Sequence, residues 1–254
     1  MENRRLIFVT NDDSYLSKGF RHIVELASEF GDVIAIAPDR VQSGMSQAIT
    51  ITQPLFLRKV ESGDGVEIYA FSGTPVDCSK VAFDHIFVGR KVDLVLSGIN
   101  HGSNAAVNVM YSGTMGAAIE GSFYNIPAIG LSLDDHDADA DFSATLPVIR
   151  NIVAQVLKNS LPIGSCLNVN FPDSQSYAGV KVCRQACGQW INEWAPLKQP
   201  NGSDWYWLTG SFQCKDSDAD CDRVALDNNY VTITPTKIDF TDYSLLEELK
   251  NWNL

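Results

Sequence analysis

Two adjacent carboxylates, Asp12 and Asp13, follow the apolar, strand-forming residues 6–9. A run of β-branched and aromatic residues without alternation is typical of a parallel strand buried on both faces. Ligands of open α/β sheets bind beyond the carboxyl ends of such strands. Neighbouring carboxylates raise each other's pKa, and a hard divalent cation would relieve their repulsion. The alternative is a helix cap or a structural turn, because Asp favours both positions.

Polar segments also follow two further apolar runs of the same kind. Residues 33–37 lead into residues 39–46, and residues 92–97 lead into residues 98–104. A helix expected over residues 18–30 joins the first two strands into a parallel β-α-β unit with a right-handed crossover. All three polar segments are therefore expected at one edge of one sheet.

A fourth polar segment, with Ser112, Gly113 and Thr114, is predicted to begin a helix of small residues. Free N–H groups, two hydroxyls and a glycine for close approach make a helix start suited to anions. An ordinary capped helix that packs closely through its small residues is the alternative. Both interpretations stay open on this segment alone.

These segments supply a complementary set of ligands. Asp12 and Asp13 offer anionic oxygens, while Ser43 and Asn100 offer neutral ones. Oxygen ligands of this kind suit Mg²⁺ or Mn²⁺ better than zinc, which prefers His or Cys. The groups at residues 112–114 could then hold phosphate oxygens while the metal activates a water. The predicted reaction is phosphoester hydrolysis.

Composition and missing motifs exclude several other classes. The formal charge of -12 over 254 residues argues against a general nucleic-acid binder. The longest apolar runs are too short for a membrane span or a secretory segment, so we expect a cytoplasmic protein without a membrane partner. The P-loop, the GxGxxG fingerprint and the GxSxG elbow are absent, which argues against an NTPase, a dehydrogenase and a serine hydrolase. The six cysteines show no CxxC pair and are expected to be reduced.

The fold class expected is α/β, with a Rossmann-like, mostly parallel sheet and helices on both faces over residues 1–172. Regular alternation of helix and strand stops after Pro172. Residues 173–254 are predicted to form β-arms and a terminal helix, and exposed arms of this kind usually find a partner chain. Further strands are expected at residues 49–52, 55–57, 67–70, 126–133, 166–171, 180–184, 205–208 and 230–234, and further helices at residues 76–88, 142–158 and 243–252.

Three features of the chain outside the strand ends have structural interpretations. Residues 216–222 imitate the start of an EF-hand loop, but Cys221 replaces its glycine and Asp227 its bidentate glutamate, which argues against calcium. Residues 134–141 are expected to be a solvated acidic turn. The tryptophans of the tail could stack on a base, although packing in an arm or an interface is favoured; they are Trp190, Trp194, Trp205 and Trp207.

Several motifs, spread from Asn11 to Pro235, resemble the SurE family of survival proteins, which act as 5'/3'-nucleotidases. They are Asn11-Asp12-Asp13, Ala37-Pro38-Asp39-Arg40, Gln42-Ser43-Gly44, Ser72-Gly73-Thr74-Pro75, Asp77-Cys78, Ser97-Gly98-Ile99-Asn100, Gly102, Tyr111-Ser112-Gly113-Thr114, Pro127-Ala128-Ile129, Leu167-Asn168-Val169-Asn170, and Tyr230-Val231 with Thr234-Pro235.

The resemblance implies a divalent metal ion, Mg or Mn, one per subunit, held by Asp12, Asp13, Ser43 and Asn100. It implies nucleoside 5'- and 3'-monophosphate substrates, with short polyphosphate as a further substrate, and a homo-oligomer, dimer or tetramer, assembled through the carboxyl-terminal arms. Catalysis is expected to depend on Asp12 and Asp13. Contacts to phosphate or substrate are expected from Asn11, Gly44, Asn104, Ser112, Gly113 and Thr114.

The chain departs from the family pattern at two places. Ser14 stands where the family usually has glycine, so this turn either keeps a negative φ or carries strain. His101 follows Asn100 in place of a small residue, and Ala106-Val107-Asn108 replaces an acidic triplet. His101 could contact a phosphate or the base, although facing solvent or supporting another residue is favoured. These changes leave an alternative function open, a nucleotide-binding sensor or oligomeric scaffold with little or no turnover.

Overall fold

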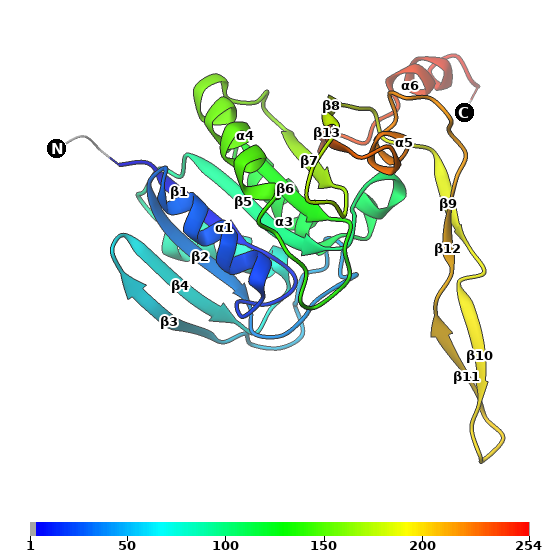
Figure 1. Ribbon diagram of the computed structural model, residues 1–254, viewed down its shortest axis with the longest axis horizontal. Coiled ribbons are helices and arrows are strands. Elements are labelled where there is room, and N and C mark those ends of the chain that lie inside the picture. The colour runs from blue at the N-terminus through cyan, green and yellow to red at the C-terminus, as the bar shows by residue number, and fades with distance from the viewer. Residues whose placement is uncertain (1–3, 254) are drawn as a thin grey trace.

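Nine strands form the central sheet of the computed structural model, which describes residues 4–253 (Figure 1). These strands are β1 (Leu6–Thr10), β2 (Asp32–Pro38), β3 (Leu57–Gly63), β4 (Val66–Phe71), β5 (Leu94–His101), β6 (Ala128–Leu133), β7 (Ser165–Phe171), β8 (Gly179–Val182) and β13 (Tyr230–Lys237). Their order across the sheet is β3-β4-β2-β1-β5-β6-β7-β13-β8. The six strands from β4 to β7 are parallel, while β3 and β13 run antiparallel to their neighbours β4 and β7.

Helices cover both faces of this sheet, as the sequence predicted. One face carries α1 (Lys18–Ser28) and α4 (Thr145–Asn159), and the other carries α2 (Pro75–Val81) and α3 (Gly113–Phe123). Strand β1 is buried along its whole length because Ile7 and Val9 pack in the first core, while Leu6 and Phe8 pack in the second. The expected fold class, α/β with a mostly parallel Rossmann-like sheet, is confirmed.

Two local predictions in the first half of the chain are wrong. Residues 49–52 form no strand, because the N–H of Thr50 donates to Asp77 and the carbonyl of Ala48 accepts from Thr74, so this segment is held by the start of α2. The helix expected to reach residue 88 ends as α2 at Val81 and continues as a π-helix, η1 (Ala82–Ile86). Strands β3 and β4 are joined by a turn in which Asp64 and Gly65 both have positive φ.

The carboxyl-terminal region contributes to the sheet as well as to an arm. Residues 180–184 and 230–234 were expected as isolated strands of an arm, but β13 pairs with β7 and β8 pairs with β13 within the main sheet. The arm is therefore an insertion between β8 and β13 of the main sheet. The helix α5 (Asp222–Asp227) precedes β13, and α6 (Tyr243–Leu249) follows it.

A long two-stranded arm projects from the body (Figure 1). Its base pairs β9 (Gly188–Ile191) with β12 (Ser211–Cys214), and its outer part pairs β10 (Trp194–Lys198) with β11 (Asp204–Leu208). Every residue of β10 and β11 is exposed. Across residues 4–253, no helix combines the length and the apolar character that a membrane crossing needs.

Candidate active site at the carboxyl edge of the sheet

Asp12 lies just beyond the end of β1, and its side chain is almost fully buried, with 3% of its surface exposed. Its Oδ1 accepts a hydrogen bond of 2.6 Å from the hydroxyl of Thr114 at the start of α3. Burial raises the pKa of Asp12 to about 7, the charge of Asp13 adds to the rise, and the Thr114 hydroxyl opposes it. The carboxylate is thus held in one orientation at a position where its charge is unfavourable.

Asp13 is tied to the end of β5, where its Oδ2 accepts the backbone N–H of His101 at 3.0 Å. Burial raises the pKa of Asp13 too, while the N–H of His101 and the imidazoles of His101 and His136 oppose the rise. Within residues 4–253, no lysine or arginine forms an ion pair with either carboxylate. Two carboxylates therefore lie side by side without a lysine or arginine partner in the described chain.

Asn100 reaches the same edge from inside β5, rather than from the loop in which the sequence had placed it. The pairing of β5 with β6 shifts register between Ser97 and Asn100, a β-bulge of the kind that re-aims side chains. The Nδ2 of Asn100 donates to the carbonyl of Gly102 at 2.7 Å. Because the amide nitrogen is used in this way, the Oδ1 of Asn100 is left as the ligand end.

A cavity of about 370 Å³ opens over these groups. Six of the predicted site residues line it: Asp12, Ser43, Gly44, Asn100, Asn104 and Ser112. Asn104 is buried, and its Nδ2 donates to Ser132 at 2.8 Å. The structure thus brings together side chains from four separate segments of the chain, at the edge where the strand ends predicted them.

The amino-terminal end of α3 lies against Asp12. Ser112 is the N-cap, and its hydroxyl accepts the N–H of Met115 at 3.0 Å. A Cβ at Gly113 would lie 3.0 Å from Oδ2 of Asp12, a tight contact, so a larger residue here would have to shift the carboxylate. Thr114 is fully buried and bonds to Asp12. Gly113 and Thr114 therefore position the carboxylate, whatever their contacts with phosphate.

Asn11 holds the turn after β1. Its Nδ2 donates to the carbonyl of Ser14 at 3.0 Å and to the hydroxyl of Ser17 at 2.9 Å. Its Oδ1 is buried and has no hydrogen-bond partner in the described chain. Ser14 adopts φ 84°, so the turn keeps the conformation that glycine prefers and Ser14 carries the strain.

Sequence reasoning missed a second group of residues around the cavity. His136 lies in the turn that was expected only to be solvated, although this turn follows the carboxyl end of β6 at the functional edge. Trp190, Glu193, Leu208 and Thr209 come from the arm. Only Trp190 had been considered as a ligand-stacking residue, and packing had been favoured for it.

The site fits a hard divalent cation. All four predicted ligands, Asp12, Asp13, Ser43 and Asn100, offer oxygen atoms. The carboxylates have no cationic partner in the described chain, and burial with mutual repulsion raises the pKa of Asp12. A bound Mg²⁺ or Mn²⁺ would supply the missing positive charge.

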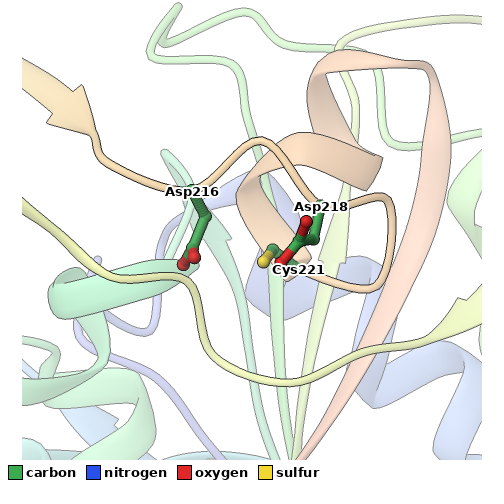
Figure 2. Close-up of side chains that lie close together, drawn as sticks. All are labelled: Asp216, Asp218 and Cys221. Carbon is green, nitrogen blue, oxygen red and sulfur yellow. The ribbon is translucent and has the colours of Figure 1, made fainter.

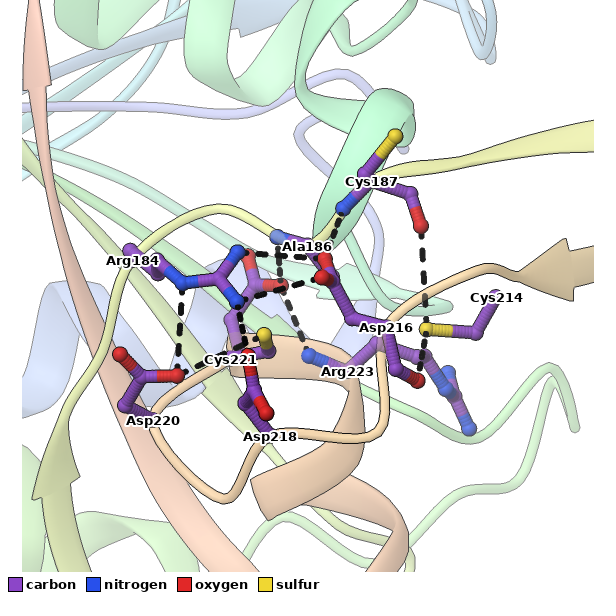
Figure 3. Close-up of polar contacts among 10 residues, drawn as sticks. Arg184, Ala186, Cys187, Cys214, Asp216, Asp218, Asp220, Cys221 and Arg223 are labelled. Carbon is purple, nitrogen blue, oxygen red and sulfur yellow. Dashed lines mark hydrogen bonds and ion pairs between the residues drawn. The ribbon is translucent and has the colours of Figure 1, made fainter.

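A second acidic cluster lies at the base of the arm. Ligand atoms of Asp216, Asp218 and Cys221 all lie within 4.8 Å of one another (Figure 2). The guanidinium of Arg184 occupies this cluster, at 3.2 Å from Asp216 and 3.0 Å from Asp218, with Asp220 at 3.3 Å (Figure 3). An arginine thus neutralises these carboxylates, which supports the expectation that residues 216–222 are not a calcium loop.

Comparison with known proteins identifies the family of the chain. Residues 7–192 match the family model described as Survival protein SurE. The chain belongs to the SurE family. The resemblance predicted from the sequence motifs is thereby confirmed.

Relatives of this SurE chain match it over its full length. A 5'-nucleotidase SurE from Phocaeicola vulgatus is 49% identical over 254 residues, covering 100% of this chain and 98% of the relative. A 5'-nucleotidase SurE from Bacteroides fragilis is 46% identical over 256 residues, covering 100% of both chains. The crystal structure of the SurE protein from Aquifex aeolicus superimposes with a TM-score of 0.83 at 32% identity, covering 96% of this chain and 98% of that chain.

Proposed function

We propose that this protein is a metal-dependent phosphohydrolase that releases phosphate from nucleoside 5'-monophosphates. Nucleoside 3'-monophosphates and short polyphosphate are proposed as further substrates. One observation carries the proposal: Asp12 is buried beside Asp13 at the floor of an open cavity, and no cationic side chain of residues 4–253 pairs with either. Full-length similarity to relatives named 5'-nucleotidase SurE supports the substrate class.

In this proposal Asp12, Asp13, Ser43 and Asn100 hold one Mg²⁺ or Mn²⁺ per subunit. The metal, when bound, would act as a Lewis acid on the phosphoryl oxygens and neutralise their charge. Asp12 keeps Oδ2 free because Oδ1 accepts from Thr114, and Asp13 keeps Oδ1 free because Oδ2 accepts from His101. Each carboxylate therefore has one oxygen fixed by the protein and one available for the cation or for a proton of the attacking water.

The start of α3 is proposed to hold the phosphate. Met115 N–H is already capped by Ser112, and the backbone N–H of Thr114 is directed at the carboxylate of Asp12, so Gly113 contributes the available N–H group of the first turn. The positive end of the helix dipole adds to its attraction for an anion. Asn11, Gly44 and Asn104 are proposed to support the substrate around this position. Asp12 and Asp13 remain the residues on which catalysis depends.

A panel of metals and phosphate esters tests the proposal. Purified protein is incubated with nucleoside 5'- and 3'-monophosphates and tripolyphosphate, with Mg²⁺, Mn²⁺ or EDTA, and released phosphate is measured. Metal-dependent release above an Asp12→Asn control supports it. Tight nucleotide binding by calorimetry without any release would instead support the sensor alternative.

We also propose that the arm pairs with a second copy of the chain, giving a dimer or a tetramer. The outer arm exposes large apolar side chains, which a monomer would leave in water; they are Trp194, Leu197, Trp205, Tyr206, Trp207 and Leu208. Replacing residues 195–207 with a two-glycine turn should reduce the mass measured by light scattering to that of one 27.9 kDa chain. An unchanged mass would refute the role of the arm. Location in the cytoplasm stays a prediction from the sequence.

A further inference from the structure

The cavity above Asp12 has two walls of different chemistry. The wall from the sheet edge is polar and carries Asp12, Asn100 and Ser112. The wall from the arm carries an aromatic ring, an aliphatic side chain and one carboxylate, from Trp190, Leu208 and Glu193. With the proposed cation bound at Asp12, a ligand that spans the cavity would place an anionic end at the sheet-edge wall and an apolar, hydroxyl-bearing end at the arm wall.

The ring of Trp190 is held in place by the body of the same chain. Its Nε1 donates to the Oδ1 of Asn108 at 2.8 Å, and Asn108 in turn donates to the carbonyl of Ser103 at 3.2 Å. On the arm, Trp190 packs edge-on against Phe212 across the β9–β12 pair, with ring centroids 6.1 Å apart. Trp190 is thus a fixed part of the cavity, although it comes from a projecting arm (Figure 1).

A buried carboxylate fastens the arm to the same segment. Asp222 is fully buried, and it accepts the N–H of Ala106 at 3.0 Å and the N–H of Ala186 at 2.9 Å. Ala106 follows the residues that line the cavity, and Ala186 precedes the arm strand β9. These two anchors, Asp222 and the Trp190–Asn108 bond, set the position of the arm wall relative to Asp12.

We propose that Trp190 is a substrate-binding residue that stacks on the nucleobase, and that Glu193 accepts hydrogen bonds from the ribose hydroxyls. This assignment rests on the proposed function, because it places the phosphate of a nucleoside monophosphate at the sheet-edge wall. Every base has a π-face, so one tryptophan serves all nucleosides. The negative charge of Glu193 repels phosphate and fixes the orientation in which the substrate enters.

The assignment predicts discrimination between phosphate esters. A nucleoside monophosphate would contact both walls, whereas glycerol 2-phosphate would contact only the sheet-edge wall. Loss of Trp190 should therefore weaken hydrolysis of the nucleotide and leave that of glycerol phosphate nearly unchanged. A purely structural role of Trp190 would instead reduce both reactions by the same factor.

The experiment compares kcat and KM of Trp190→Ala, Trp190→Phe and the control Trp252→Ala with those of the full-length wild-type protein. For adenosine 5'-monophosphate, Trp190→Ala should lower kcat/KM by roughly 10- to 100-fold, mainly through KM, because one stacking contact is lost. Trp190→Phe should recover most of the loss. Trp252, which is exposed near the end of the chain, should have no effect.

Two results would overturn the assignment: equal loss with adenosine 5'-monophosphate and glycerol 2-phosphate, or no loss with either. Failure of the proposed function is recognised separately, as a wild-type protein that hydrolyses neither ester with Mg²⁺ or Mn²⁺. In that case calorimetric titration with adenosine 5'-monophosphate decides the role of Trp190. Weaker binding by Trp190→Ala would support the assignment, and equal binding would overturn it.

Discussion

Two acidic groups of this chain look alike in sequence and differ in structure. In the strand-end pair, Asp12 lines a cavity and Asp13 lies beside it, and neither forms an ion pair with a lysine or arginine of the described residues. The arm triad, Asp216, Asp218 and Asp220, surrounds the guanidinium of Arg184. Their pKa values move in opposite directions: burial raises that of Asp12 to about 7, and Arg184 lowers that of Asp216 to about 2.

This difference indicates that the surroundings of the carboxylates matter more than their number for which group is suited to bind a metal. The arm triad has more carboxylates and an EF-hand-like spacing, yet the guanidinium of Arg184 already pairs with all three in the folded chain. The strand-end pair has fewer, but folding removes them from water without supplying a counter-charge. A cation therefore gains more at the strand-end pair, since it offsets an existing electrostatic cost.

The largest expected effect separates the two groups by activity. Asp12→Asn should reduce nucleotidase activity on the order of 10³-fold, because one metal ligand and its charge are lost while the bond from Thr114 can persist. Asp218→Asn is the matched control and should change activity by less than about 3-fold, since it removes one exposed ion pair. Phosphate release at saturating Mg²⁺ measures both. Similar losses in the two variants would break the comparison.

The thermal stability of the protein should depend on metal and on pH through the strand-end pair and not through the arm triad. The folded pKa of Asp12, about 7, lies above its ordinary value of 3.8, so between these pH values the native state binds more protons than the unfolded state. Stability of the metal-free protein therefore falls as pH rises through this window. Mg²⁺ or Mn²⁺ should raise Tm by about 5 °C near pH 8 and by less near pH 5.5.

Scanning calorimetry with and without EDTA at the two pH values checks this expectation. Asp12→Asn provides the control, because its metal-free Tm should depend less on pH and respond less to metal. A metal effect of the same size at both pH values would contradict the link to Asp12. A response that persists in Asp12→Asn but is lost in Asp218→Asn would move the metal to the arm triad.

The strand-end site could be predicted from the sequence because short segments of the chain encode both the buried strands and the polar residues that follow them. Residues 6–9 and 33–37 are apolar without alternation, and only a sheet covered on both faces buries such runs, so the polar residues that follow them had to meet at one edge. Ser43, Asn100 and Ser112 lie at the cavity with Asp12 for this reason. Gly113 was expected to allow close approach, and it does so toward Asp12.

The arm and its contacts could not be predicted in the same way. The sequence of β13 predicts a strand but not its partner. Its pairing with β7 joins residues more than 60 positions apart, which no local pattern reveals. The contact of Trp190 with Asn108 spans 82 positions. Such pairings depend on where the whole chain folds back, so the second wall of the cavity is visible only in the structure.

A moderate effect is expected when the arm triad loses its arginine. Arg184→Met keeps the length of the side chain and removes its charge, so three carboxylates would repel one another at the arm base. Because the pairs are partly exposed, the Tm should fall by only about 2–4 °C. The variant should also gain stabilisation by Ca²⁺ that the wild type lacks. Calorimetry in EDTA and in Ca²⁺ measures both, and an unchanged variant would show that Arg184 is not what distinguishes the two groups.

The smallest effect concerns the backbone that carries the strand-end pair. Ser14 holds φ 84°, whereas residues 214–222 of the arm triad loop contain no positive φ. Ser14→Gly should relieve strain but lose the bond from Leu16 N–H to the hydroxyl and gain flexibility when unfolded, for a net rise of about 1–2 °C in Tm. Ser14→Ala keeps the strain and loses the hydroxyl, so its Tm should fall. If Tm fell equally in both variants, Ser14 would stabilise the protein through its hydroxyl, and its backbone would carry no strain. The turn that presents Asp12 and Asp13 would then be as relaxed as the loop around Arg184.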